Sequence, residues 1–412
     1  MAGRRALGRR FGWLWAAFAV SSYGTGLGFG AFPLIAVLVL HSGPAQVAAL
    51  AATGRVVGAL VAVPLGPWVE FRRKRPVMIA MDLARFGALM TVPLAFLLGR
   101  LGFAQLLVVS VVVAAADIGF RAASGAYLKA LVAPRDLLVA NGRFEATTWT
   151  ATMVGPPLGG AAIGLFGPVV TVVADAVSHL LSALGLRAIG GGEPRPVRTG
   201  ASGPRAGELV EGWRGVLAHP VLRPLFFNAI VVNGLIMASG PLLAVLLLDG
   251  LGYAPWQYGL VFALPCVGGL VGSRLAPRLV ARFGQHRVML TSGALRACWP
   301  LGLAFVQPGA AGMVLIMAVQ FGLVTCCGVF NPVLATYRLD HTDTDRVART
   351  LSAWSISSSL AIAAMTAGWG LLAAVTGTRT AIAIAGVLLL ATPLLLPRRA
   401  GAPRGEPSVL AG

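Results

Sequence analysis

Long apolar runs, separated by short polar or Gly/Pro-rich breaks, occupy almost the whole chain. A helix that crosses a bilayer needs about 20 mostly apolar residues, and each run has about this length or more. The breaks therefore predict twelve membrane-spanning helices, near residues 13–40, 47–69, 76–98, 103–126, 142–165, 168–189, 222–248, 257–279, 288–306, 311–337, 348–374 and 379–397. The longest runs exceed one crossing, so we expect tilted or kinked helices there.

The longest polar interruption lies near the middle of the chain, between residues 190 and 220. It is rich in Gly, Pro and Arg, which is typical of a flexible linker. The sequence therefore predicts a six-helix bundle over residues 1–189, a linker over 190–220, a second six-helix bundle over 221–397 and a polar tail over 398–412.

Composition excludes a soluble protein. Apolar residues make up 57% of the chain and charged residues only 11%, against about 45–50% and about 25% in soluble domains. A membrane-embedded enzyme or a receptor is an alternative from another class. The sequence has no P-loop, no metal-binding histidine cluster and no sizeable soluble segment to support it. We therefore expect neither catalysis nor a bound cofactor or metal.

The charge balance reports topology. The 33 Lys and Arg residues outnumber the 14 Asp and Glu residues, for a formal charge of +19. With a cytoplasmic N-terminus, 27 basic residues fall on the inner side, two (Arg100 and Arg379) fall outside, and four lie within spans. Because basic residues concentrate in cytoplasmic loops, both termini, the linker and the tail are expected in the cytoplasm of a multi-pass cell-membrane protein. No nucleic acid partner is expected.

The two halves of the chain resemble each other. Residues 33–40 (PLIAVLVL) and 241–248 (PLLAVLLL) are identical at six of eight positions, at an offset of 208. Further matches at offsets of 211 and 210 pair Val77-Met78 and Arg85 with Val288-Met289 and Arg296, and Phe120 and Tyr127 with Phe330 and Tyr337. Three matches in order indicate a six-plus-six duplication. Parallel six-helix halves around a midplane site are typical of a major facilitator-type transporter.

The loop between the second and third spans carries a recognisable motif. Gly66 is followed four residues later by Glu70 and then by a basic cluster, which resembles the major facilitator loop signature. Glu70 replaces the usual Asp, and Phe71 and Arg73 replace the usual Arg and Gly. The acid can accept from amides at the N-terminus of a neighbouring helix. The resemblance implies a latch for the outward-open state, formed by Gly66, Glu70, Arg73, Lys74 and Arg75 with Arg282 and Gly284 of the aligned second-half loop. The alternative is that these basic residues only set topology.

The fifth span resembles the antiporter motif of the same superfamily. It contains Gly142, Ala151 in place of one glycine, and then Gly155, Pro156, Pro157, Leu158, Gly159 and Gly160. The resemblance implies an exporter whose fifth helix seals against a partner helix, whereas the alternative is tight helix packing in an importer. Residues 175–183 and 219–223 are similar to the drug-efflux branch typified by macrolide and siderophore exporters. The fold that the resemblance implies is all-α, with twelve transmembrane helices in two pseudo-symmetric bundles.

Ionisable residues inside a membrane are costly and therefore mark candidate functional positions. Besides His179 and Asp175, these candidates are Asp82, Arg85, Asp117, Arg121, Arg55 and Arg296. Asp82 with Arg85, and Asp117 with Arg121, have the helical spacing of ion pairs and can be structural. Glu145, near a predicted helix end, is set aside.

Asp175 has no basic residue three or four positions away, and Ser178, His179 and Ser182 share its helix face. An unpaired carboxylate in a low dielectric is suited to reversible proton binding. The alternative is a carboxyl satisfied by Arg55 or by hydroxyls of a neighbouring helix.

Polar and aromatic residues of the spans are candidates for lining a substrate cavity that suits amphipathic organic solutes. The candidates are Ser22, Tyr23, Trp149, His179, Asn233, Gln320, Trp354 and Ser358. The sequence as a whole predicts a monomeric, proton-coupled antiporter that exports drug-like or natural-product molecules by alternating access, with the proton gradient as its energy source. A proton-coupled importer on the same fold is the alternative.

Overall fold

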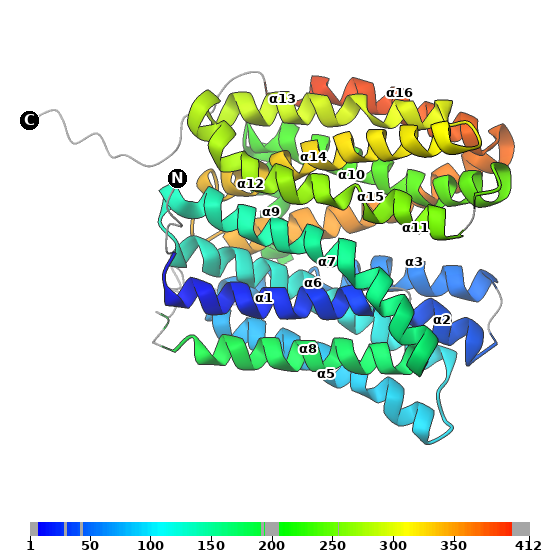
Figure 1. The fold of residues 1–412 in the computed structure, drawn as a ribbon. Helices are drawn as coiled ribbons and strands as arrows, with labels where there is room; N and C mark the ends of the chain where they lie inside the picture. The colour runs from blue at the N-terminus through cyan, green and yellow to red at the C-terminus, as the bar shows by residue number, and fades with distance from the viewer. Residues whose placement is uncertain are drawn as a thin grey trace, which may run out of the picture.

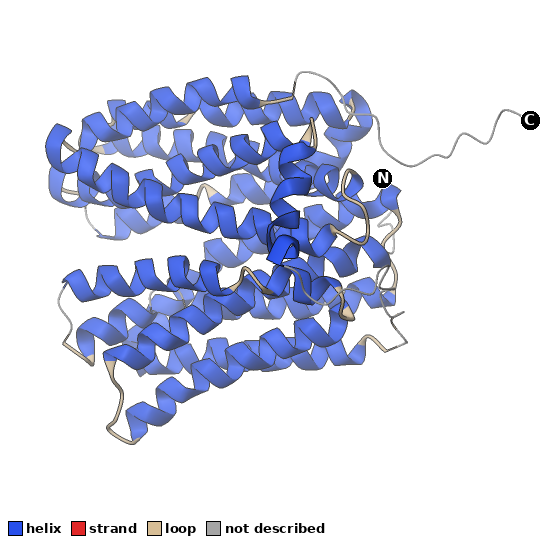
Figure 2. Ribbon diagram, turned by 180° about the vertical axis from the view of Figure 1, so that it is seen from behind, coloured by secondary structure: helices blue, strands red, loops and turns tan. Residues whose placement is uncertain are grey.

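The structure is a computed structural model that describes residues 7–28, 31–41, 44–190, 193, 206–253 and 255–397. The predicted tail over 398–412 and much of the predicted linker lie outside the described residues. Throughout the described part the fold is helical, and no strand occurs there (Figure 2). The all-α prediction is confirmed.

The first six predicted spans form the lower layer of Figure 1. Its helices are α1 (Arg9–Leu27), α2 (Ala31–Leu38), α3 (Pro44–Val61), α4 (Leu65–Glu70), α5 (Lys74–Leu97), α6 (Phe103–Leu131), the short η1 (Pro134–Asp136), α7 (Leu137–Phe166) and α8 (Pro168–Ala188). We refer to this layer as the first half.

The last six predicted spans form the upper layer of Figure 1, the second half. Its helices are α10 (Leu222–Val245), η2 (Leu246–Gly250), α11 (Pro255–Ala263), α12 (Cys266–Phe283), α13 (Gln285–Cys298), η3 (Pro300–Phe305), α14 (Ala310–Asp340), α15 (Val347–Thr376), α16 (Thr378–Ala391) and η4 (Thr392–Leu395).

Nine helices in the described part are long and apolar enough to cross a membrane. The three other predicted spans correspond to α1–α2, α3–α4 and α7. The first two are divided after Leu27 and Val61, and α7 is a continuous 30-residue helix that contains two prolines. The longest predicted run, 13–40, therefore breaks into two helices, whereas the long runs 311–337 and 348–374 form the single helices α14 and α15.

Aligned positions of the two halves are buried alike and repeat one ring contact. Met78 and Met289 are fully buried. The Arg85 guanidinium lies 5.0 Å from the ring centroid of Phe120, and that of Arg296 lies 3.6 Å from the centroid of Phe330. The duplication in the sequence is thus visible as a repeated arginine–aromatic contact in the core of each half.

The predicted linker contains a helix that the sequence does not predict, α9 (Ala206–Ala218). Gly212, Trp213 and Val216 recur at helical spacing and turn one face of α9 toward α15 and α10. The Trp213 indole donates a hydrogen bond to the Ser357 hydroxyl (2.8 Å). The helix is not predicted because the Gly, Pro and Arg content of residues 190–220 as a whole is typical of a flexible linker, and the amphipathic segment is short.

Two glycines of the antiporter-like motif bring α7 into backbone contact with α1. A Cβ atom at Gly155 would lie 2.6 Å from the Gly26 Cα, and one at Gly159 would lie 2.3 Å from the Leu27 carbonyl oxygen. Gly160 of the same motif does not contact α1, because a Cβ atom there would have no neighbouring atom within 4 Å. The motif therefore fixes a close crossing inside the first half.

This crossing predicts different outcomes for neighbouring alanine substitutions. We expect Gly159→Ala to lower the thermal stability of the purified protein, because overpacking typically costs about 1–3 kcal/mol. Gly160→Ala is the matched control and should be neutral or slightly stabilising, since alanine favours helix by up to about 1 kcal/mol. Melting curves in detergent measure both variants. Equal melting temperatures would contradict the close crossing.

Candidate functional site

Ionisable side chains of α5, α6 and α8 meet in one cluster inside the first half. The His179 Nδ1 lies 3.5 Å from Asp82 Oδ1, and its Nε2 lies 3.4 Å from Asp175 Oδ1. The i,i+4 spacing of Asp175 and His179 places both on the face of α8 that packs against α1 and α5. One imidazole therefore stands between two carboxylates.

The cluster continues through Arg85 toward α6. The Arg85 Nη1 lies 3.8 Å from Asp82 Oδ1, and its Nη2 lies 3.2 Å from Asp117 Oδ1. The Asp117 Oδ2 accepts from Arg121 Nε at 2.6 Å. We call the six residues the charge chain: Asp175, His179, Asp82, Arg85, Asp117 and Arg121.

Small polar residues complete the surroundings of the carboxylates. The Thr25 hydroxyl of α1 donates to Asp175 Oδ1 (3.2 Å), and the Ser182 hydroxyl donates to Asp82 Oδ2 (2.7 Å). Gly28 leaves room for Asp175, because a Cβ atom there would lie 3.2 Å from its Oδ2. Helix α1 therefore borders the charge chain directly.

The middle of the charge chain is buried and incompletely hydrogen-bonded. His179 Nδ1 and Asp82 Oδ1 face each other beyond normal hydrogen-bond length, and within the described residues neither has a hydrogen-bond partner. Exposure rises along the chain to 38% for the Asp117 side chain and 66% for that of Arg121. An additional proton would satisfy the buried centre, and the Arg121 end is the accessible one.

The structure thus joins what the sequence treats as separate pairs. Asp82–Arg85 and Asp117–Arg121 are linked to each other by the Arg85–Asp117 contact. The alternative in which Arg55 satisfies Asp175 is wrong for this conformation. Arg55 is exposed on α3, and the contacts found for Asp175 are to Thr25 and His179. A hydroxyl of a neighbouring helix, the other alternative, is present.

Arg296, the counterpart of Arg85, has different partners. Its Nη2 donates to Asn228 Oδ1 (2.6 Å), and no carboxylate contacts it among the described residues. At the offsets of 211 and 210, the positions of Asp82 and Asp117 correspond to Gly293 and Cys327. The second half therefore keeps the buried cation but not the carboxylates.

Glu145, which is not among the predicted site residues, connects the two halves. Its Oε1 accepts from the Trp149 indole (2.8 Å) and from Asn331 Nδ2 of α14 (2.7 Å). Helix α7 begins at Leu137, so Glu145 lies in its third turn rather than near its end. The i,i+4 spacing from Glu145 to Trp149 is the signal that could have identified it.

The predicted cavity residues occupy different environments. Tyr23 is exposed, and Ser22, Trp149, Asn233, Gln320 and Ser358 are partly buried. His179 is buried in the charge chain. The prediction for Trp354 is wrong in this conformation, since it is 6% exposed and packs edge-on against Phe226 in the core of the second half.

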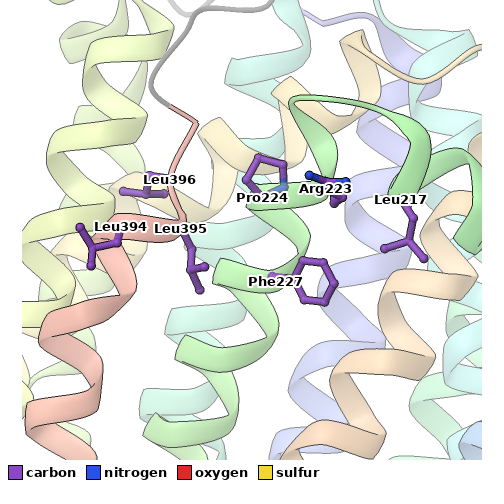
Figure 3. A pocket seen from close by; sticks show the side chains of 7 residues that line it. All are labelled: Leu217, Arg223, Pro224, Phe227, Leu394, Leu395 and Leu396. Carbon is purple, nitrogen blue, oxygen red and sulfur yellow. The ribbon is translucent and has the colours of Figure 1, made fainter.

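A surface pocket of about 590 Å³ lies elsewhere, where α9 and α10 approach η4 (Figure 3). Six of its seven lining residues are apolar, namely Leu217, Pro224, Phe227, Leu394, Leu395 and Leu396, and the seventh is Arg223. None of the predicted cavity residues lines it.

Among the predicted gating residues, Glu70 and Gly66 contact the second half. We call the end of the molecule that carries the loops around residues 72–75 and 282–287 the basic end. There the Arg349 amide, in the first turn of α15, donates to Glu70 Oε2 (3.0 Å). A carboxylate is favourable at a helix N-terminus. Gly66 allows α4 to approach α15, because a Cβ atom there would lie 3.1 Å from that of Ser352.

The other predicted gating residues have other partners. Lys74 Nζ donates to the carbonyl of Val69 (2.9 Å) and that of Glu70 (2.5 Å), which closes the end of α4. Arg75 Nη1 donates to the Gly190 carbonyl (2.9 Å), and Arg73 is exposed. Arg282 lies over the Phe283 ring, and Gly284 ends α12 with a φ of 83°.

Glu70 is 4% exposed, and burial raises its pKa to about 7. The Arg349 amide, Lys74 and the Arg349 charge act in the opposite direction, and Asp345 adds to the increase in pKa. The carboxyl at the basic end therefore titrates near neutral pH.

These features together define a polytopic membrane transporter. A family model of the Major Facilitator Superfamily matches residues 14–325 and 240–410. The chain belongs to this superfamily, whose members are transporters and not enzymes.

Solved structures share the fold at low identity. A bacterial homologue of the iron transporter ferroportin in an outward-facing state has a TM-score of 0.80 and 17% identity over 94% of this chain and 98% of that one. The human organic anion transporter MFSD10 has a TM-score of 0.76 and 14% identity, over 94% and 99%. The E. coli fucose:proton symporter FucP has 0.71 and 13%, over 95% and 98%. A comparison with curated protein sequences found no match.

The pKa of Glu70 predicts a pH dependence for closure of the basic end. The closed form, with a pKa of about 7, binds an extra proton relative to an open form in which Glu70 is hydrated and has its ordinary pKa of 4.5. This contribution to closure is complete below the lower value and is lost as the pH rises through the higher one. Raising the pH from about 6 to about 8 should therefore favour opening of this end.

Cysteine reactivity measures this opening. In a variant whose four native cysteines are replaced by alanine, Ser352→Cys places a thiol at the 2%-exposed contact with Gly66. Its maleimide labelling rate, divided by that of an Arg135→Cys variant at an exposed position, should increase with pH. Glu70→Gln should make this increase smaller. An unchanged pH profile in Glu70→Gln would contradict the assignment.

Proposed function

We propose that the protein is a proton-coupled antiporter of the drug-efflux branch, which exports amphipathic small molecules by alternating access. The observation that carries this proposal is the charge chain, which occurs in one half of a duplicated fold. Its buried centre, an imidazole between two carboxylates, has the chemistry of reversible proton binding.

The net charge of the six-residue charge chain favours uptake of one proton. Three carboxylates and two guanidinium groups give a net charge of −1 when His179 is neutral (2 − 3 = −1). One proton makes the cluster neutral, and a low-dielectric interior favours neutral clusters over charged ones. The incompletely bonded pair of His179 and Asp82 is a suitable position for that proton.

Helix α1 connects the charge chain to the candidate substrate cavity. It contacts the charge chain through Thr25 and packs against the antiporter-like motif of α7 through Gly26. It also carries the cavity candidates Ser22 and Tyr23. A proton on His179 makes the imidazole a cation, which competes with the Thr25 hydroxyl for Asp175 Oδ1, so the position of α1 responds to the proton.

The basic end faces the cytoplasm in this proposal, in accordance with the distribution of basic residues. The contact between Glu70 and α15 then closes the cytoplasmic side, and the described conformation is outward-facing. A monomer in the cell membrane, driven by the proton gradient without a cofactor, completes the proposal.

Transport in inverted membrane vesicles tests the proposal. With an acidic lumen, the wild type should accumulate fluorescent amphipathic drugs in a gradient-dependent manner. Asp175→Asn and His179→Gln should reduce the accumulation nearly to the level without a gradient, because each removes a proton-binding group from the chain. Asp343→Asn, in the loop between α14 and α15, is the control carboxylate and should retain transport.

Two outcomes would contradict the proposal. Gradient-dependent accumulation that persists in both charge-chain variants would show that the charge chain does not couple transport to the proton gradient. Proton-driven uptake into right-side-out vesicles, without accumulation in inverted ones, would instead establish the importer.

A further inference from the structure

We infer that Glu211 of the linker helix α9 is a positioning residue of the latch at the basic end: it holds the Arg349 guanidinium on Phe71 and thereby keeps α15 docked on the first half. The inference rests on alternating access, which the proposed function includes, but on neither the direction of transport nor the coupling ion.

Arg349 is contacted from three segments of the chain. Its amide donates to Glu70 Oε2 (3.0 Å), and its guanidinium lies 4.9 Å from the ring centroid of Phe71. Both partners belong to the first half. The third partner is Glu211, whose Oε2 accepts from Arg349 Nη1 in a close ion pair. The linker thus supplies the carboxylate that pairs with the guanidinium at the point where the halves meet.

Tight packing fixes the position of the Glu211 carboxylate. A Cβ atom on the next residue, Gly212, would lie 2.5 Å from the Arg349 carbonyl oxygen, so α9 touches the backbone of α15 there. The following residue, Trp213, is hydrogen-bonded to Ser357. The contacts of Gly212 and Trp213 therefore fix α9 on α15 and hold Glu211 next to Arg349.

Loss of the Glu211 charge destabilises the docked arrangement. The Arg349 side chain is 9% exposed, and its Nε has no partner within the described residues. Glu70 bonds to the Arg349 amide rather than to its guanidinium. Without Glu211, a nearly buried cation therefore loses its ion-pair partner, and this cost is relieved when the basic end opens and water reaches the guanidinium.

The Ser352→Cys reporter in the cysteine-free full-length protein tests this inference without substrate. We expect Glu211→Gln to raise the maleimide labelling rate roughly three- to tenfold, the range of a partly exposed ion pair. Glu211→Asp should restore most of the protection. Arg214→Gln, an exposed position on the same helix, is the matched control and should label at the parent rate.

A double-mutant comparison distinguishes positioning from general destabilisation. Phe71→Leu should itself raise the labelling rate. If Glu211 acts by holding Arg349 on Phe71, Glu211→Gln should add little in the Phe71→Leu background. Melting curves of all variants report any general loss of packing.

Two results would overturn the inference. These are labelling of Glu211→Gln at the parent rate, and an equal fold-increase in both backgrounds. The labelling assay needs neither a proton gradient nor a drug. Failure of the vesicle experiment would therefore leave its outcome intact, and the two proposals fail separately.

Discussion

Ionisable groups can remain inside a bilayer-spanning bundle only where neighbours balance their charge. In the first half this constraint determines which helices meet. Asp82 and Arg85 on α5 need Asp117 on α6 and His179 on α8, and the contacts of 3.2–3.8 Å among them tie the three helices together. The balance falls short by one positive charge. This shortfall in charge is the basis of the proposed proton binding.

The second half shows what the same scaffold becomes without the carboxylates. Arg296 keeps its aromatic contact with Phe330 and finds a neutral partner in Asn228. The duplicated core therefore does not require the acids for packing. The carboxylates of the charge chain therefore distinguish the first half from the second. The two halves contact each other at α7, where Glu145 accepts a hydrogen bond from Asn331.

The sequence predicts the helices well because a membrane-spanning helix must be apolar over most of its length. It also places the Glu70 carboxylate near a helix N-terminus, since the loop motif is local. Contacts between helices are harder to predict from the sequence, because the spacing of Asp82, Asp117 and Asp175 along the chain does not show that they lie close together in the fold. Glu145 is missed because its helix starts five residues before the predicted span. Trp354 is misplaced because an aromatic residue of a packed core and one of a cavity look the same in a sequence.

The strengths of the contacts between the halves suit a transporter that must break them in every cycle. Among the described residues, each ion pair joins groups of the first half or joins α9 to α15 or to its N-cap residue Arg346, and none joins the first half to the second. The halves instead meet through hydrogen bonds: the Arg349 amide donates to Glu70, Asn141 Nδ2 donates to the Thr336 hydroxyl (2.9 Å), and Asn331 donates to Glu145. Lys129 Nζ of α6 also donates to the carbonyls of Leu339 and Thr342 in the second half. A fully buried ion pair across the interface would cost several kcal/mol to separate. Exchange between two conformations of comparable population tolerates only a few kcal/mol of bias. Placing the arginine–glutamate pair between the linker and α15 therefore strengthens the latch indirectly, while the contacts that must open include no ion pair among the described residues.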